Sequence, residues 1–362
     1  MPPDRRGERQ AALRLALASE GLDGLLVSHL PNIRYLTGFT GSAALLLVQH
    51  SATTLVTDFR YAVQAPSEAG DAAVVEIDQT SVWERLGRLL AAAPVTRLGV
   101  EAQALTVRDA ERVGGLTRAR VAPTSDLVER LRAIKSPEEV EAIRTAAALA
   151  QAALAETLPT IRPGQTELDV AAALESSLRR GGSEWHPFPT IVASGPRAAL
   201  PHARTSTRQI QAGEWLLLDF GAQVDGYCAD LTRTVVVGAR ADERQRTVYE
   251  LVRTAQQRAL DHLRPGMTGR EGDALARDVI AARGFGDAFG HSLGHGLGLE
   301  VHEAPRLAPT ADAALPIHAV VTVEPGVYLP GWGGVRLEDD VHLAPDGAAV
   351  LSDAKTELLE LV

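Results

Sequence analysis

The second part of the chain contains an internal repeat. The segment Arg162-Pro163-Gly164-Gln165-Thr166 recurs as Arg264-Pro265-Gly266-Met267-Thr268, 102 residues later. Each copy follows a long predicted helix and precedes a shorter one and then a β-rich stretch. The predicted helices are Pro137–Leu158, Glu167–Arg180, Asp242–His262 and Arg270–Arg283. Two helix-ending Pro-Gly turns can match by chance, but the repeated order of elements predicts a duplicated domain with a pseudo-two-fold axis.

The residues before the repeat have the pattern of an α/β domain. Short apolar runs such as Gly24–Ser28 and Thr53–Thr57 alternate with helical patterns, and Pro31-Asn32 is typical of a turn. Further along, Ser136 can cap a helix that has proline at its first position and glutamate three residues after the cap. We therefore expect an α/β N-terminal domain at residues 1–125, a linker at 126–135 and an α+β catalytic domain at 136–362.

Composition excludes several classes of function. The chain has 362 residues, a net charge of −10 and a pI near 5.5, and it has no dense run of Lys or Arg, so a nucleic-acid partner is not expected. A single cysteine, Cys228, rules out an internal disulfide. The N-terminus is polar and no apolar run is long enough for a membrane span. We expect a cytoplasmic protein with no membrane partner.

Two aspartates flank a predicted β-hairpin in the first copy of the repeat. Asp219 ends the apolar run Trp215–Leu218, and Asp230 precedes the β-like run Leu231–Val237. With Val224-Asp225-Gly226 as the turn, the two aspartates are expected to face each other directly, with Cβ atoms roughly 4.5–5.5 Å apart. A lone aspartate is usually a solvated surface group. Here the flanking residues look buried, and a buried carboxylate must be paired or bind a metal.

The second copy shows the same pattern with two glutamates. Glu324 and Glu338 flank the turn-rich segment Leu329–Gly334, and pairing about the centre of that segment places them opposite each other. Asp219 and Glu324 are 105 residues apart, and Asp230 and Glu338 are 108 apart, both close to the repeat offset. The two acid pairs are therefore expected to be one hairpin, duplicated. Four carboxylates in one pocket need about two divalent cations.

Three histidines, His291, His295 and His302, lie in a glycine-rich segment between the acid pairs. Glycines on both sides of His295 permit close approach of a ligand, whereas their spacing is a weak match to a phosphate loop. A single histidine is more often a core or surface residue, but three beside four acids favour a metal site. Carboxylates with one imidazole suit Mn²⁺, Co²⁺, Fe²⁺ or Zn²⁺, and the expected chemistry is two-metal hydrolysis.

These residues resemble the pita-bread metallopeptidases, which include Xaa-Pro dipeptidase (prolidase), aminopeptidase P and methionine aminopeptidase. The first part of the chain, especially Asn32–Phe39, is similar to the N-terminal domain of the prolidase, aminopeptidase P and creatinase branch, which methionine aminopeptidase lacks. The segments of the second part that match are Ile191–Gly195, Pro201–Ala203, Leu218–Gly221, Asp230–Thr234, Gly294–Glu303, Val323–Tyr328 and Gly334–Asp340.

The resemblance implies roles for individual residues. The implied metal ligands are Asp219, Asp230, His295, Glu324 and Glu338. His202 and His302 would contact the substrate and the tetrahedral intermediate, Glu324 would also move the proton of the attacking water, and His291, Arg336 and Tyr328 would line or assist the proline side. Thr232 shares a strand face with Asp230, while Cys228 is interpreted as buried packing. Phe188 stands where some relatives have a tyrosine, so no role can rest on that hydroxyl.

The predicted function is an Xaa-Pro dipeptidase with two divalent metal ions per chain. Mn²⁺ is the expected ion, with Co²⁺ and Zn²⁺ as alternatives, and the resemblance implies a homodimer. Aminopeptidase P, which acts on longer Xaa-Pro peptides, is the main alternative. A metal-free creatinase-like amidinohydrolase and a non-catalytic binding module, such as the peptidase-like domains of histone chaperones, are disfavoured because all five ligand positions are present.

Overall fold

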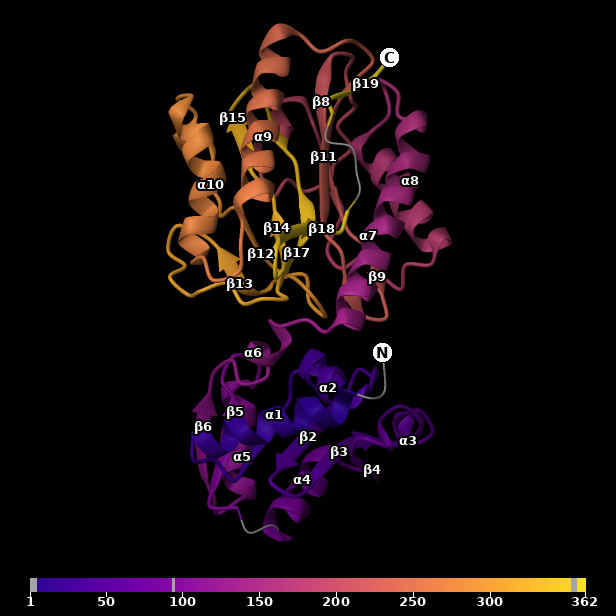
Figure 1. Ribbon diagram of the computed structural model, residues 1–362. Coiled ribbons are helices and arrows are strands. Elements are labelled where there is room, and N and C mark those ends of the chain that lie inside the picture. The colour runs from indigo at the N-terminus through magenta and orange to yellow at the C-terminus, as the bar shows by residue number, and fades with distance from the viewer. Residues whose placement is uncertain (1–4, 93–94, 353–356) are drawn as a thin grey trace. The chain divides into compact units, whose positions relative to one another are not determined.

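The computed structural model describes residues 5–92, 95–352 and 357–362 (Figure 1). The chain divides into two compact units, Met1–Arg132 and Ala133–Val362. Within the segment 126–135, expected as a linker, Glu129–Arg132 form helix α6 of the first unit. The bounds predicted for the two domains, 1–125 and 136–362, remain a prediction from the sequence.

The first unit is built on a six-stranded mixed sheet with the strand order β4-β3-β2-β1-β5-β6. Two of its strand pairs, β1–β2 and β2–β3, are antiparallel and the others are parallel. Leu26, Leu47 and Leu98 from neighbouring strands pack with Leu86 and Leu90 of α4 in its core. The strands are β1 Gly24–Val27, β2 Ala44–Gln49, β3 Thr53–Asp58, β4 Val74–Asp78, β5 Arg97–Glu101 and β6 Arg120–Thr124. The helices are α1 Arg6–Ser19, α2 Leu30–Thr37, α3 Gln64–Ala69, α4 Val82–Ala92, α5 Val107–Leu116 and α6 Glu129–Arg132.

The sequence patterns missed helices α2, α3 and α6 of this unit. Pro31-Asn32, predicted as a turn, lie instead in the first turn of α2, where proline removes no helical hydrogen bond. Strands β4 and β6 were also missed. Both are edge strands of mostly half-exposed residues, so they lack the continuous apolar run that marks a buried strand.

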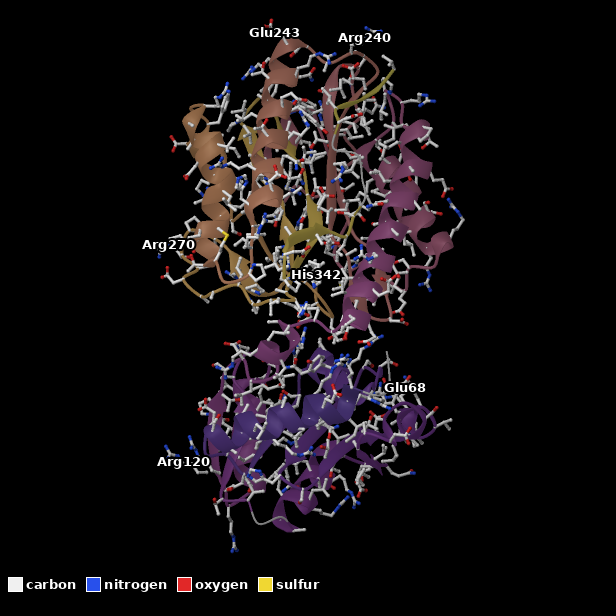
Figure 2. The ribbon with its side chains drawn as sticks, in the orientation of Figure 1. Glu68, Arg120, Arg240, Glu243, Arg270 and His342 are labelled. Carbon is white, nitrogen blue, oxygen red and sulfur yellow. The ribbon has the colours of Figure 1, made fainter. Side chains whose placement is uncertain are left out.

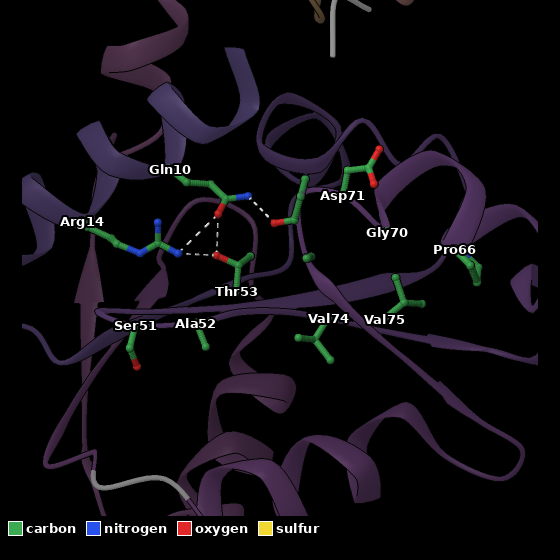
Figure 3. A pocket seen from close by; sticks show the side chains of 12 residues that line it. Gln10, Arg14, Ser51, Ala52, Thr53, Pro66, Gly70, Asp71, Val74 and Val75 are labelled. Atoms are coloured by element: carbon green, nitrogen blue, oxygen red, sulfur yellow. Dashed lines mark hydrogen bonds between the residues drawn. The ribbon is translucent and has the colours of Figure 1, made fainter. Parts of the chain in front are cut away.

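A pocket of the first unit lies between α1 and the end of the sheet at β3 and β4 (Figure 3). Arg14 donates from Nη2 to Thr53 Oγ1 at 2.7 Å and to Gln10 Oε1 at 3.3 Å. Gln10 in turn donates from Nε2 to the Ala72 carbonyl at 2.9 Å. These polar side chains join α1 to the sheet, so their hydrogen bonds serve the fold of this unit.

The second unit contains the predicted duplication. One pair of helices, α7 Pro137–Thr157 and α8 Glu167–Gly181, packs on one side of the strands, and α9 Glu243–His262 with α10 Gly269–Ala282 packs on the other (Figure 1). Its larger sheets have the orders β19-β11-β8-β7 and β13-β12-β14-β17-β18, and β9–β10 and β15–β16 are two-stranded. The strands are β7 Ile191–Ser194, β8 Glu214–Phe220, β9 Gln223–Val224, β10 Tyr227–Cys228, β11 Leu231–Val237, β12 Gly294–Gly296, β13 Glu303–Leu307, β14 Val320–Val323, β15 Gly326–Leu329, β16 Gly333–Arg336, β17 Asp339–Ala344, β18 Gly347–Val350 and β19 Leu359–Leu361.

The helix starts show why the repeated sequence folds twice in the same way. Thr166 caps α8 and Thr268 caps α10, each in a reciprocal capping box with an acid three residues later. Beyond each helix, the chain returns to pair with its cap: Thr166 bridges to Gln209, and Thr268 bridges to Ala314. Ser136 caps α7 in a third such box, as its sequence predicts.

Alternate residues of the central strands supply two separate cores. Leu216 and Leu218 of β8 pack with the apolar faces of α7 and α8, whereas Leu217 packs with α9 and α10. The strands are therefore covered on both faces, which explains their continuous apolar runs. The few acids in these strands consequently lie in a dry interior.

The first acid pair does not have the predicted register. The β9–β10 turn has Asp225 and Gly226 at its two central positions, with φ of 50° and 78°, as in a two-residue hairpin of the mirror-image type. The centre of the hairpin is thus one residue later than predicted. Asp219 pairs with Thr232, so the prediction that Asp219 faces Asp230 directly is wrong. The two aspartates are diagonal neighbours, which still places their side chains within reach of a shared ligand.

The second acid pair has the predicted register. Val323 pairs with Asp339 and Gly326 pairs with Arg336, which leaves Glu324 opposite Glu338 in the short gap between the two ladders. The two hairpins therefore correspond less closely than predicted, because the position opposite the acid is Thr232 in one copy and Glu338 in the other.

Charged side chains occupy the outer surface of the second unit. Arg240 and Glu243, for example, are exposed where β11 leads into α9 (Figure 2). Among the helices of the described ranges, none combines the length and apolar character needed to cross a membrane.

Candidate functional site

The four predicted acidic ligands come from the ends of the central strands. Asp219 is the penultimate residue of β8, and Asp230 directly precedes β11. Glu324 directly follows β14, and Glu338 directly precedes β17. All four carboxylates therefore arise where the two copies of the repeat meet.

A bridge between Thr232 and Glu338 joins the two hairpins at this point. The amide of Glu338 donates to the Thr232 carbonyl at 3.1 Å, and Thr232 Oγ1 donates to Glu338 Oε2 at 2.6 Å. Thr232, which the sequence placed on the same strand face as Asp230, thus orients one of the acidic ligands.

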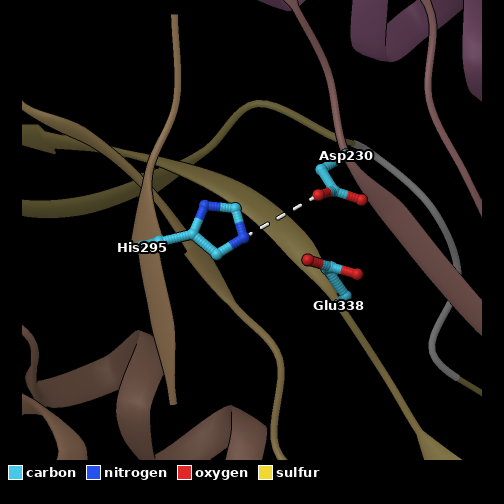
Figure 4. A group of neighbouring side chains, drawn as sticks. All are labelled: Asp230, His295 and Glu338. Atoms are coloured by element: carbon cyan, nitrogen blue, oxygen red, sulfur yellow. Dashed lines mark ion pairs between the residues drawn. The ribbon is translucent and has the colours of Figure 1, made fainter. Parts of the chain in front are cut away.

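His295 completes the cluster from β12 (Figure 4). Its Nδ1 lies 3.0 Å from the carbonyl of Gly296, so Nδ1 carries the proton and Nε2 presents its lone pair to the acids. Nε2 lies 3.5 Å from Glu324 Oε1 and 3.9 Å from Asp230 Oδ2. One possible ligand atom each from Asp230, His295 and Glu338 lies within 4.8 Å of the others. These distances suit ligands that surround a cation.

Glycine is required beside this histidine. A Cβ added to Gly294 would lie 2.0 Å from the Thr322 carbonyl oxygen, so only glycine permits β12 to approach β14 this closely. Thr322 Oγ1 also accepts from the amide of His295 at 3.1 Å and lies 3.2 Å from Glu324 Oε1. The close packing therefore sets the positions of both ligands.

The electrostatics of the cluster call for a cation. Burial raises the pKa of Asp230 and of Glu324 well above the usual range, and the neighbouring charge of Glu338 raises both further. Burial, followed by the charge of Asp219, raises the pKa of Glu338 to about 8. Within the described residues, the buried Oδ1 atoms of Asp219 and Asp230 have no hydrogen-bond partner. A buried carboxylate without a partner is costly, and divalent cations would satisfy both oxygens and relieve the repulsion.

Arg336 connects this cluster to a second group of polar side chains. Its guanidinium forms an ion pair with Asp219, donates from Nε to Thr232 Oγ1 at 3.1 Å and from Nη1 to the Pro201 carbonyl at 3.1 Å. Nη1 also donates to the Tyr328 hydroxyl at 2.9 Å. The two-residue spacing of Arg336 and Glu338 indicated that their side chains share one face, and both bond to Thr232 Oγ1. That spacing gave no sign of the ion pair between Arg336 and Asp219.

His291 lies beside Tyr328. Its Nε2 accepts from the Tyr328 hydroxyl at 2.8 Å, and its Nδ1 donates to the Ser292 carbonyl at 2.8 Å. Burial and the nearby charge of Arg336 lower the pKa of His291 to about 4. The ring is therefore neutral near pH 7, and Arg336 is the cation of this group.

The two other predicted histidines are exposed. His302 precedes β13, and its ring centroid lies 4.3 Å from that of His295. His202 is on the loop between β7 and β8. Burial raises the pKa of Asp219, and the charge of Arg336 and, to a smaller extent, those of His202 and His302 oppose that rise. The structure thus brings both histidines to the acid cluster. Phe188 is half-buried, and its ring lies 3.1 Å from the place that a Cβ on Gly221 would occupy.

Sequence reasoning missed two supporting acids that follow Glu338. Asp340 accepts a hydrogen bond from the amide of Asp230 at 3.1 Å. Asp339 is paired with Arg233 at 2.7 Å, and both are buried. The acidic run Glu338-Asp339-Asp340 was a visible signal, since a buried strand seldom has three consecutive acids. Cys228 is buried, as expected, and burial raises the pKa of its thiol.

The duplicated fold and the buried cluster of four carboxylates with one imidazole define the class: a metal-dependent hydrolase of the pita-bread type. The model of the metallopeptidase family M24 matches residues 141–345, and that of the creatinase/prolidase N-terminal domain matches residues 9–134. The chain belongs to metallopeptidase family M24. The predicted fold class, an α/β N-terminal domain with a pita-bread catalytic domain, is confirmed.

Individual relatives agree with this assignment. The chain is 42% identical over 234 residues to an Xaa-Pro dipeptidase of Pyrococcus furiosus, a match that covers 65% of this chain and 67% of the relative. A solved structure described as an Xaa-Pro dipeptidase from Bacillus anthracis has a TM-score of 0.96 and 40% identity, covering 98% of this chain and 100% of the other. An X-Pro aminopeptidase from Thermotoga maritima has a TM-score of 0.90 and 35% identity, covering 97% and 99%.

Proposed function

We propose that this metallopeptidase is an Xaa-Pro dipeptidase, which hydrolyses the bond between an N-terminal residue and a following proline. The observation that carries the proposal is the buried cluster of four acids and His295, with the cation Arg336 directly beside it. A hydrolytic centre next to a fixed positive charge suits a short substrate whose own carboxylate lies near the scissile bond. The names of the relatives support the same substrate class.

In this proposal, Asp219, Asp230, His295, Glu324 and Glu338 hold two divalent cations. When bound, the cations polarise the substrate carbonyl and activate a water molecule. Mn²⁺ is the proposed ion, with Co²⁺ and Zn²⁺ as alternatives. The donor set fits, because carboxylate oxygens with one neutral imidazole suit these ions.

Glu324 is proposed as the general base as well as a ligand. Thr322 Oγ1 lies 3.2 Å from its Oε1, which fixes the orientation of the carboxylate. Glu324 takes the proton of the attacking water and delivers it to the proline nitrogen as the peptide bond breaks. His202 and His302 contact the substrate on the exposed side of the cluster and stabilise the negative charge that develops on its carbonyl oxygen.

Arg336, Tyr328 and His291 are proposed to receive the proline. Arg336 donates to the Tyr328 hydroxyl, which in turn donates to the neutral ring of His291. The carboxylate of a dipeptide would share Arg336 with Asp219 through charge-assisted hydrogen bonds. The alternative is aminopeptidase P, which is supported by the similarity to the X-Pro aminopeptidase from Thermotoga maritima. The substrates of an aminopeptidase P have a neutral amide at this position.

The choice between the two is tested with matched peptides. We expect Leu-Pro to be cleaved with a higher kcat/KM than Leu-Pro-Ala. Amidation of the C-terminus of Leu-Pro should lower kcat/KM by an amount equivalent to about 2–5 kcal/mol, the scale for removing one partner of a buried charge pair. Leu-Ala serves as the control for the proline requirement. If the amide and the tripeptide are cleaved with the same kcat/KM as Leu-Pro, the enzyme does not recognise the carboxylate, and aminopeptidase P is the correct assignment.

The homodimer and the cytoplasmic location remain predictions from the sequence. Sedimentation at micromolar concentration tests the first, since a dimer of this chain has twice the mass of 38.4 kDa. Fractionation of the source cells tests the second.

A further inference from the structure

The loop that carries His202 leaves β7 at Ser194 and returns to β8 at Glu214. Its amides have hydrogen-bond partners within the second unit along the length of the loop, among them those of Leu200, Ala203, Ser206 and Arg208. Near its middle, the Pro201 carbonyl accepts from Arg336. The loop is thus an ordered support for an exposed histidine.

One buried carboxylate holds both ends of this loop. Glu167, the first residue of α8, has no exposed surface. Its Oε1 accepts from the Ser194 amide at 2.8 Å and from Ser194 Oγ at 2.9 Å, at the start of the loop. Its Oε2 accepts from the Ser206 amide at 3.0 Å and from Ser206 Oγ at 2.6 Å, near the end. Arg197 Nε lies 3.1 Å from both oxygens and completes the closure.

These bonds exceed what α8 needs for its own stability. Thr166 already caps the helix, in a capping box with Asp169. An acid in the first turn adds about 0.3–1 kcal/mol through the helix dipole, and an exposed side chain supplies that effect equally well. A fully buried glutamate with partners on both ends of one loop therefore serves the loop.

We infer that Glu167 is a positioning residue that fixes the loop of residues 195–208 and thereby places His202 at the acid cluster. The consequence for catalysis rests on the role proposed above for His202, whereas the consequence for the loop does not. Glutamine is the informative substitution, because it has the same shape but turns one acceptor oxygen into an NH₂ group. That group would meet an N–H donor and would leave Arg197 without its charged partner.

A matched control lies in the other copy of the repeat. Asp273 of α10 is buried and accepts from the amide of Leu293 at 2.9 Å, and it pairs with Arg277, which donates to the His291 carbonyl at 2.7 Å. Asp273→Asn should therefore loosen the segment that carries His291 and leave the His202 loop unchanged.

The test combines hydrogen exchange with a double-mutant cycle on the full chain. For Glu167→Gln we expect faster exchange in residues 195–208, unchanged exchange in β8 and β11, and a metal content equal to that of the wild type. We expect kcat/KM for an Xaa-Pro dipeptide to fall by about 10- to 100-fold, the scale for a displaced catalytic group. In a His202→Ala background, Glu167→Gln should lower kcat/KM by less than about 2-fold, because the two residues act as one unit. Ser206→Ala removes the hydroxyl that donates to Glu167 Oε2 and accepts from the Arg208 amide, and it leaves the Glu167 carboxylate in place. It should give the same pattern with smaller effects, and it covers the case in which Glu167→Gln does not fold.

Unchanged exchange in the loop would overturn the inference, and so would an equal loss of activity with and without His202. A wild-type protein that cleaves no Xaa-Pro peptide would count against the proposed function alone, since the exchange experiment needs no substrate.

Discussion

Replacing Glu324 with glutamine is expected to lower kcat by about 100- to 10,000-fold, the range for general acid–base catalysis, with a much smaller change in KM. The substitution keeps the shape of the side chain and one oxygen beside Thr322. It removes the group that accepts and returns the proton, and that interaction exists only in the transition state. A loss in kcat is therefore the expected form of the defect.

Steady-state kinetics on Leu-Pro, together with the metal content of the same sample, would test this prediction. Glu250→Gln is the matched control, because Glu250 is exposed on α9 and pairs with Arg253 on the same helix. The activity of this variant should equal that of the wild type. An effect of Glu324→Gln confined to KM would rule out the proton-transfer role.

Replacing Asp230 with asparagine is expected to change stability in opposite directions with and without metal. In the chelated protein, burial and the charges of Glu338 and Asp219 raise the pKa of Asp230, so folding must either bury its charge or add a proton to it, and both cost stability. Asparagine removes that cost at nearly constant volume, so the chelated variant should be more stable than the chelated wild type. A gain of about 1 kcal/mol corresponds to a Tm increase of roughly 2–4 °C for a unit of this size.

With metal present, the same substitution should be destabilising, because a ligand is lost. Loss of a mere supporting partner costs about 10- to 100-fold in metal affinity, so loss of a direct ligand should cost at least about 100-fold. Thermal unfolding with and without a chelator, with elemental analysis in parallel, measures both effects. Equal Tm shifts in the two conditions and full metal occupancy would exclude Asp230 from the site.

The sequence predicted the acid pairs because apolar strands with a single carboxylate at the end are rare in a dry core. It predicted the register of Glu324 and Glu338 but not that of Asp219 and Asp230. The difference comes from one turn, since only a turn centred on Asp225-Gly226 satisfies the preference of short hairpins for positive φ at both positions. Closer attention to that preference would have placed Asp219 opposite Thr232.

Contacts between distant segments could not be predicted from local patterns. Arg336 was expected near the proline, but its ion pair with Asp219 depends on two hairpins that meet across the repeat. Glu167 looks like an ordinary first-turn acid in the sequence, and only the fold shows that it holds Ser194 and Ser206. In the first unit, β4 and β6 lie at the edges of the sheet and are partly exposed. They therefore lack the continuous apolar run by which a buried strand is recognised in a sequence.

We propose that this chain hydrolyses Xaa-Pro peptides with two cations held by the five residues of the cluster. Titration of the chelated protein with Mn²⁺, with Leu-Pro hydrolysis and bound metal measured in each sample, tests this proposal. We expect no hydrolysis in the chelated protein, and activity that rises with binding and reaches its plateau at two ions per chain. Hydrolysis in the chelated protein, or two bound ions without hydrolysis of any Xaa-Pro peptide, would contradict the account.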